Sequence, residues 1–302
     1  MYRTILHICS ISLLIGLCNQ LYGKKPTNAQ EYYKNSPYIQ QIQERMRVSA
    51  EFPCNIAILS DYDDVMACPR SAMGTWYKIA TIVGMKNLMR VVRVHHKTIF
   101  KDGAIYNQDG IRINGAANCM RFLGKSIPAF NIKYDAIMKA LSYAKPINAT
   151  IELYQKLQSM HIPILIVTNN DKETLDLKLH NMNKELLKNQ KTIFEPEAVF
   201  YAGLHDSTIS DDCYCLEGKP SIAYYKKAFA YAQKIVDDTH NNWLYIFIDD
   251  QEKNIQAMRE YAQSHNLPII AFQRTTSKRL MKDLEWLFGT QFLAESLVDI
   301  AH

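Results

Sequence analysis

The stretch Cys54-Asn-Ile-Ala-Ile-Leu59, followed at once by Ser60-Asp61-Tyr62-Asp63, decides the fold class. A short apolar run that stops abruptly at polar residues is typical of a strand buried on both faces of a parallel sheet. Similar runs recur further along the chain, at 162–167, 198–201, 243–248 and 267–272.

Helical patterns separate these predicted strands. Apolar residues at helical spacing predict helices over 149–160, 171–188, 219–236 and 251–265, and a further helix within 27–50. Strands that alternate with helices predict an α/β fold with a doubly wound, Rossmann-like parallel sheet and helices on both of its faces.

The segment 67–145 interrupts this alternation. It is too long for an ordinary connection between a strand and a helix. We therefore predict an α/β core of residues 24–66 and 146–302, with an inserted cap at 67–145 after the first strand. We expect the cap to be mainly helical, with helices near 72–83 and 135–144 and turns at 101–103 and 108–110.

The N-terminus resembles an export signal. Arg3 precedes an apolar run over 5–17, and the sequence turns polar at Asn19. Such a run is too short to span a bilayer but suits the apolar region of a signal peptide. We expect residues 1–23 to be removed on export, leaving a periplasmic or secreted protein without a membrane span. The alternative is a buried N-terminal helix in a cytoplasmic protein.

The composition excludes few classes of function. The 302 residues include 35 basic and 30 acidic side chains, and the formal charge of +5 is too mild to indicate a nucleic-acid partner. A basic run within 90–101 is typical of a solvated face. The seven cysteines lack the spacing of a zinc site, so we interpret them as packing residues.

Two carboxylates follow the first predicted strand, and they suit different tasks. Asp61 can attack a phosphorus atom as a nucleophile, and Asp63 can act as general acid and base. Ligands of open α/β sheets bind beyond the carboxyl ends of the strands. The other polar residues expected at this edge are Thr168, which can bind a phosphoryl oxygen, the cationic Lys219, and the pair Asp249 and Asp250.

So many carboxylates repel one another unless a cation lies between them. Oxygen ligands with retained waters suit magnesium, so we expect a Mg²⁺ ion at this edge. Lys219 would supply further positive charge to hold the phosphoryl group.

The ordered set Asp61-x-Asp63, Thr168, Lys219 and Asp249-Asp250 resembles the haloacid dehalogenase (HAD) superfamily over residues 54–272. The resemblance implies a phosphatase with an inserted cap, in which Asp61 is the nucleophile and Asp63 the acid and base. It also implies that the metal is held by the Asp61 side chain, the Asp63 carbonyl and the Asp249 side chain, with help from Asp250. The leader and the segment 250–254 are similar to a group of exported bacterial HAD-like proteins.

The resulting hypothesis is a Mg²⁺-dependent phosphomonoester hydrolase with an aspartyl-phosphate intermediate. Its substrate is a phosphorylated compound that the sequence does not identify. A phosphotransferase using the same site and a catalytically idle binding protein remain alternatives. A phospho-receiver domain is disfavoured, because such domains are about half as long and carry their acceptor aspartate on a later strand.

Overall fold

The structure is a computed structural model that describes residues 29–36, 39–40, 43–44, 55–68, 145–202, 210–238 and 243–289. It also describes the backbone of three short strands at 99–101, 104–106 and 112–113. The predicted leader, residues 1–23, lies outside these ranges.

The central sheet has six strands in the order β11-β10-β1-β7-β8-β9. Every neighbouring pair runs parallel. The chain builds the sheet outward from β1 to β9 and then returns to add β10 and β11 on the other side, so the direction of winding reverses between β1 and β10. The strands are β1 (Asn55–Ser60), β7 (Ile164–Val167), β8 (Ala198–Ala202), β9 (Tyr214–Cys215), β10 (Trp243–Asp249) and β11 (Ile269–Gln273).

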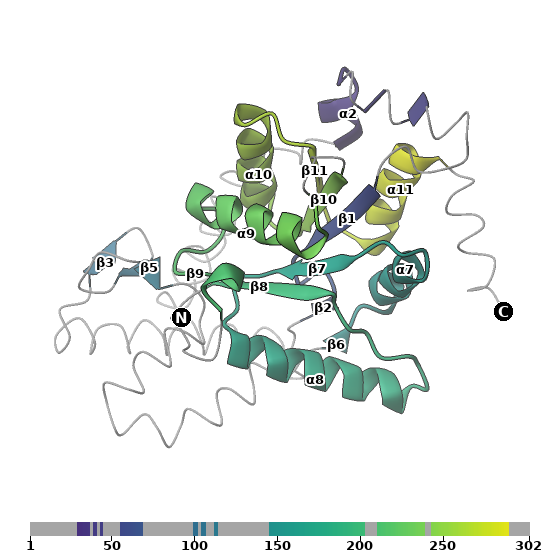
Figure 1. The fold of residues 1–302 in the computed structure, drawn as a ribbon. Coiled ribbons are helices and arrows are strands. Elements are labelled where there is room, and N and C mark those ends of the chain that lie inside the picture. Colours follow the sequence, from purple (N-terminus) through teal and green to yellow (C-terminus); the bar gives the residue numbers. More distant parts are fainter. Residues whose placement is uncertain are drawn as a thin grey trace, which may run out of the picture.

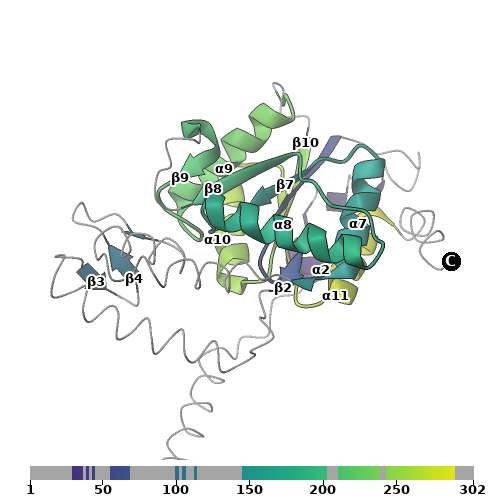
Figure 2. The same ribbon diagram turned by 90° about the horizontal axis from the view of Figure 1, so that it is seen from below.

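Helices cover both faces of this sheet (Figure 1). One apolar cluster joins α7, α8 and α11 to one face, and a second joins α9 and α10 to the other. Figure 2 shows α7 and α8 in front of the sheet when the molecule is viewed from below. The helices are α2 (Ala29–Tyr33), α7 (Asn148–Ser159), α8 (Lys172–Lys188), α9 (Ile222–Ile235), α10 (Glu252–Ser264) and α11 (Ser277–Phe288).

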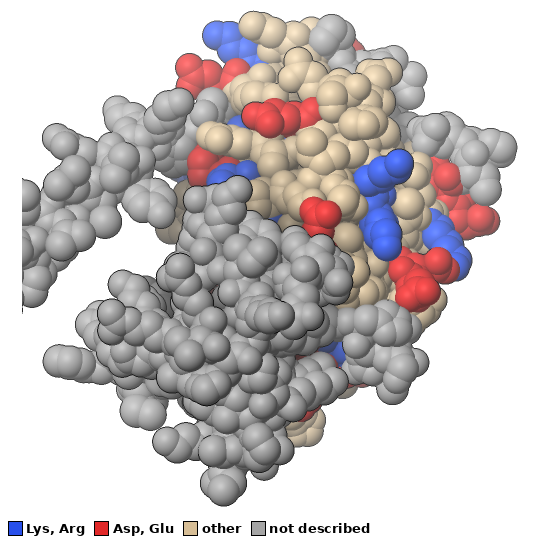
Figure 3. Space-filling view, turned by 90° about the vertical axis from the view of Figure 1, so that its left-hand side faces the viewer, with Lys and Arg blue, Asp and Glu red and all other residues tan. Residues whose placement is uncertain are grey.

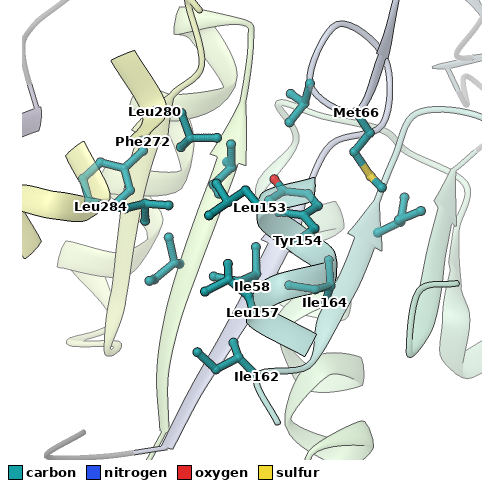
Figure 4. Packing of buried hydrophobic residues seen from close by; sticks show 14 of the residues in the cluster. Ile58, Met66, Leu153, Tyr154, Leu157, Ile162, Ile164, Phe272, Leu280 and Leu284 are labelled. Carbon is teal, nitrogen blue, oxygen red and sulfur yellow. The ribbon is translucent and has the colours of Figure 1, made fainter. Parts of the chain in front are cut away.

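The alternation of side chains along the strands explains the two clusters. Successive residues of a strand point to opposite faces, so Ile58 belongs to one cluster and its neighbours Ala57 and Leu59 to the other. Figure 4 shows Ile58 packed with Tyr154 and Leu157 of α7 on the first face. The sheet is therefore apolar on both faces, which is why its strands read as unbroken apolar runs.

The predicted α/β core with a doubly wound parallel sheet is confirmed, and its five long strands were located to within a few residues. The predicted helix over 219–236 starts too early, because Ser221 occupies the N-cap position and α9 begins at Ile222. Among the strands of the central sheet and the helices that cover it, the two-residue strand β9 and the C-terminal helix α11 were not predicted.

The two ends of the segment 67–145 lie side by side at the core. Strand β2 (Ala67–Cys68) pairs antiparallel with β6 (Lys145–Pro146), and Ala67 is opposite Pro146. Within the segment, β3 (Ile99–Lys101), β4 (Ala104–Tyr106) and β5 (Arg112–Ile113) form an antiparallel sheet. The helices predicted near 72–83 and 135–144 lie outside the described residues.

The described surface gives no single-sign electrostatic face in the view of Figure 3, where Lys and Arg side chains alternate with Asp and Glu. Among the described helices, none combines the length and apolar character that a bilayer span requires. Cys68, Cys213 and Cys215 are free thiols in the described part of the chain.

Candidate active site

The site lies where the winding of the sheet reverses, at the carboxyl ends of β1 and β10. Ser60 of β1 is in register with Ile248 of β10, and the Asp61 N–H donates to the Ile248 carbonyl at 2.8 Å. Asp61 therefore follows β1 directly beside Asp249, the last residue of β10. This reversal point is where open α/β sheets bind their ligands.

A single ammonium group bridges these two carboxylates. The Lys219 Nζ atom lies 2.9 Å from Asp61 Oδ1 and 2.6 Å from Asp249 Oδ2. Lys219 is only 3% exposed, and its N–H donates to the Asn169 side-chain oxygen at 2.7 Å. The short segment before α9 thus delivers a buried positive charge to the ends of both central strands.

The Asp249 side chain is fixed by further contacts. Its Oδ1 atom accepts hydrogen bonds from the Gln251 N–H at 2.8 Å and from the Asn254 side-chain amide at 2.9 Å. Asn254 lies in the first turn of α10, and its carbonyl accepts from the Tyr225 hydroxyl of α9. Asp249 is fully buried, and protein groups contact both of its oxygens.

Asp63 lies in a tight turn that follows β1. The turn is closed by hydrogen bonds from Asp64 N–H to Ala67 O and from Met66 N–H to Tyr62 O. Asp64 has a φ of 57°, a left-handed conformation that aspartate tolerates better than most residues. The turn leads directly into β2, so the same few residues place Asp63 and start the inserted segment.

The carboxylate of Asp63 contacts helix α8 and the loop that follows strand β7. Lys178 of α8 lies 2.7 Å from both of its oxygens, and the Asn170 side-chain amide donates to Oδ2 at 3.0 Å. The same amide nitrogen lies 2.8 Å from the Thr168 hydroxyl oxygen. Asn170 therefore joins the loop after β7 to the turn after β1.

Thr168 is 1% exposed and directly follows β7. Its hydroxyl oxygen accepts from the N–H and the side chain of Asn170, at 3.1 and 2.8 Å. A hydroxyl that accepts two hydrogen bonds can still donate its own proton. The Thr168 carbonyl accepts from the Tyr224 hydroxyl at 2.7 Å, which ties this strand end to α9.

Three carboxylates are close enough to share a metal ion. Ligand oxygens of Asp61, Asp249 and Asp250 all lie within 4.8 Å of one another. The ion pair with Lys219 supplies one positive charge against three carboxyl groups, two of which are buried. A set of hard oxygen donors with excess negative charge fits a divalent cation of the magnesium type.

Burial shifts the proton equilibria at this site. It raises the pKa of the Asp61 carboxyl to about 8, opposed by the Lys219 ammonium and reinforced by Asp249 and Asp63. Burial and the neighbouring Asp249 raise the pKa of Asp250 to about 6. Burial alone would lower the pKa of Lys219, but Asp249 and Asp61 outweigh that effect and raise it. Asp61 therefore needs added positive charge nearby to be ionised at neutral pH.

The structure brings all six predicted site residues to one edge of the sheet. It also adds two that the sequence analysis missed. Lys178 is 6% exposed and holds Asp63. Arg274 follows β11, and its N–H donates to the Asp249 carbonyl while its side chain donates to the Asp64 carbonyl.

Features of the sequence could have identified both Arg274 and Lys178. Arg274 comes just after an apolar strand, so the rule that selected Asp61 and Asp249 applies to it as well. Lys178 falls on the inward stripe of α8 together with Leu175, Met182 and Leu186.

No protein-family model and no curated protein matches this sequence. Solved structures do match it. A HAD hydrolase of family IA, variant 3, from Entamoeba histolytica has 14% sequence identity and a TM-score of 0.39, covering 75% of this chain and 88% of that one. A putative beta-phosphoglucomutase from Bacteroides vulgatus has 13% identity and a TM-score of 0.38, covering 84% and 97%.

A HAD-superfamily hydrolase from Ehrlichia chaffeensis has 15% identity and a TM-score of 0.36, covering 76% of this chain and 97% of that one. With sequence identities of 13–15% and TM-scores below 0.4, these structures do not identify the chemistry of this chain.

Proposed function

We propose that this chain is a HAD-type, Mg²⁺-dependent phosphatase that hydrolyses phosphomonoesters through a phosphorylated aspartate. The observation that carries the proposal is the bridge from Lys219 to Asp61 and Asp249, at 2.9 and 2.6 Å. A buried ammonium between two carboxylates, at the reversal point of a parallel sheet, is suited to bind a phosphoryl group next to a nucleophile.

The solvent exposure of Asp61 and Asp249 decides which of the two carboxylates would attack phosphorus. Asp61 is 7% exposed, whereas Asp249 is 0% exposed and has hydrogen-bonded oxygens. Asp61 is therefore the nucleophile in this proposal, and Asp249 is a ligand. Asp61, Asp249 and Asp250 would hold the magnesium ion, which neutralises the charge of the phosphoryl group when it is bound.

The chain's own residues would then carry two steps. In the first, an Asp61 oxygen bonds to phosphorus, the ester P–O bond breaks, and its electron pair leaves on the alcohol oxygen, which takes a proton from Asp63. In the second, water gives a proton to Asp63 and attacks phosphorus. The bond from phosphorus to Asp61 breaks, which frees the carboxylate and inorganic phosphate.

The other residues would orient the substrate. The Thr168 hydroxyl would donate to a phosphoryl oxygen, and Lys219 would neutralise charge that builds up during transfer. The inserted segment, whose ends meet the core at β2 and β6 next to Asp63, would act as a cap that selects the leaving alcohol. Export of the protein after removal of residues 1–23 also belongs to this proposal, as does the absence of a nucleic-acid partner.

The test is hydrolysis of an aryl phosphate and a set of alkyl phosphates by the full chain, with magnesium and with chelator. We expect turnover that requires the metal and is lost in Asp61→Asn. An acid quench should leave one phosphoryl group on the peptide that contains Asp61. The matched control is Asp176→Asn, which changes an exposed aspartate of α8.

Three outcomes would count against the proposal in different ways. Turnover that survives Asp61→Asn would exclude the nucleophile. Binding of magnesium with beryllium fluoride, a phosphoryl mimic, but no turnover of any ester would favour an idle binding protein. Transfer of the phosphoryl group to an added alcohol faster than to water would favour the phosphotransferase.

A further inference from the structure

Lys178 is a buried lysine in an unfavourable place. It lies in the second turn of α8, among the buried residues of that helix. It is 6% exposed and lies on the same helix face as Leu175 and Met182. Burying an ammonium group is costly unless a partner compensates, so its partners point to its role.

Those partners are the groups around the proposed acid and base. The Lys178 Nζ atom lies 2.7 Å from each Asp63 oxygen and 2.9 Å from the Asn170 side-chain oxygen. Asn170 in turn donates to Asp63 and to Thr168. The three side chains form a closed ring of contacts that leaves the Asp63 carboxylate little rotational freedom.

The backbone of Lys178 is anchored to the same turn. The Tyr62 hydroxyl donates to the Lys178 carbonyl at 3.0 Å, and the Tyr62 N–H donates to Asp61 Oδ1 at 2.8 Å. One residue of α8 is thus connected through its side chain to Asp63 and through its carbonyl to Tyr62. These contacts fix the helix against the segment that holds both proposed catalytic carboxylates.

We propose that Lys178 is a positioning residue that orients the Asp63 carboxylate toward the leaving oxygen of the substrate. This inference rests on the proposed function. Lys178 acts through Asp63 and does not itself contact the phosphoryl group. Its importance should therefore depend on how much the leaving alcohol needs the proton that Asp63 supplies.

The leaving group provides the test. An aryl phosphate releases a stable phenolate that needs little protonation, whereas an alkyl phosphate releases an alkoxide that needs a proton from Asp63. We compare kcat/KM, which covers the steps up to departure of the alcohol, for p-nitrophenyl phosphate and glycerol phosphate. In Lys178→Met we expect kcat/KM for glycerol phosphate to fall by ~10-fold or more, and that for the aryl phosphate to fall several times less.

Two further variants serve as controls for this test. Lys184→Met, an exposed lysine of the same helix, should leave both values unchanged. Lys178→Arg, which keeps the charge, should restore part of the loss. If Lys178→Met does not fold, as judged by circular dichroism, Lys178→Gln provides the same comparison, because its amide is too short to hold both Asp63 oxygens.

A double-mutant cycle tests whether Lys178 acts through Asp63. Adding Lys178→Met to Asp63→Asn should cause little further loss on glycerol phosphate, because the two residues act as one unit. Independent, multiplying losses would overturn the inference, as would an equal loss on both substrates or a gain of activity in Lys178→Met. Loss of turnover in Asp61→Asn, measured alongside, keeps these outcomes distinct from failure of the proposed function.

Discussion

Asp61 and Asp249 share the ammonium of Lys219, yet only one of them is accessible. The exposed fraction of Asp61 is 7% and that of Asp249 is 0%. The difference has a local cause: Asp249 ends β10 and is held by the first turn of α10, whereas Asp61 begins the turn toward the inserted segment. Two identical side chains on adjacent strands are therefore suited to different roles.

Removing the shared cation should destabilise the metal-free protein. In Lys219→Met, two buried carboxyl groups face each other without a positive charge between them. We expect the free energy of unfolding to fall by ~3 kcal/mol in chelator, and magnesium to recover part of that loss. Urea unfolding measures both quantities.

The control is Lys234→Met, which breaks an exposed ion pair with Asp212 and should leave the free energy of unfolding nearly unchanged. If Lys219→Met is as stable as the unmodified chain in chelator, the bridge does not stabilise the fold.

Magnesium should stabilise the folded chain through the three clustered carboxylates. At a concentration ~100 times its dissociation constant, a ligand that binds only the folded state adds about 2.7 kcal/mol. We expect Asp249→Asn to abolish the rise in melting temperature that magnesium causes, and Asp250→Asn to reduce it. Asp212→Asn, an exposed aspartate outside the cluster, should leave it intact. An unchanged magnesium response in Asp249→Asn would place the ion elsewhere.

The pH dependence of stability should reveal the buried carboxyl of Asp61. Burial raises its pKa from 3.8 to about 8, so between these values the folded chain binds more protons than the unfolded chain. Raising the pH through this window therefore lowers the free energy of unfolding in metal-free protein. Asp250, raised to about 6, contributes in the lower part of the window.

Asp61→Asn removes one of these titrating groups. Its free energy of unfolding, measured by urea in chelator, should decline less steeply between pH 4 and pH 8 than that of the unmodified chain, by up to ~1.4 kcal/mol per pH unit. Parallel pH profiles for the two proteins would show that Asp61 is not held neutral in the folded state.

The sequence predicts the central fold well because the evidence is local. Each long strand is an apolar run that ends at a polar residue, so β1 and β10 and the acidic residues after them could be found without knowing which strands pair. The start of α9 was harder to locate. The predicted helix included Lys219 and Pro220, but Ser221 occupies the N-cap position and the helix starts after it.

Other features depend on the tertiary structure. Strand β9 has two residues and exists because Tyr201 and Ala202 of β8 offer it a partner. In the sequence, Lys178 does not differ from other helical lysines, because its contact with Asp63 depends on how α8 packs against the turn after β1. Its position on the inward stripe of the helix was the available signal, but interpreting it requires knowing that this face meets the turn after β1.

Side chains cover the edge of the sheet at strand β11. Strand β11 is an edge strand, and the outward N–H and C=O groups of Ala271 bond to side chains: the N–H donates to the Tyr33 hydroxyl at 2.8 Å, and the C=O accepts from Arg259 at 3.0 Å. The Arg259 guanidinium also lies 4.3 Å from the ring centre of Tyr32. Side chains of α2 and α10 thereby occupy backbone groups of an edge strand, and uncovered groups of this kind are a template for pairing with other chains.

Tyr33→Phe should leave the buried Ala271 N–H without a partner. We expect it to lower the free energy of unfolding by ~1–2 kcal/mol and to speed hydrogen exchange at Ala271, as measured by urea unfolding and by exchange mass spectrometry. Tyr32→Phe is the matched control, because Tyr32 is 43% exposed and its ring still faces Arg259. Equal stability of the two variants would mean that the Tyr33 hydroxyl does not protect the edge, and that the packing of α2 alone covers it.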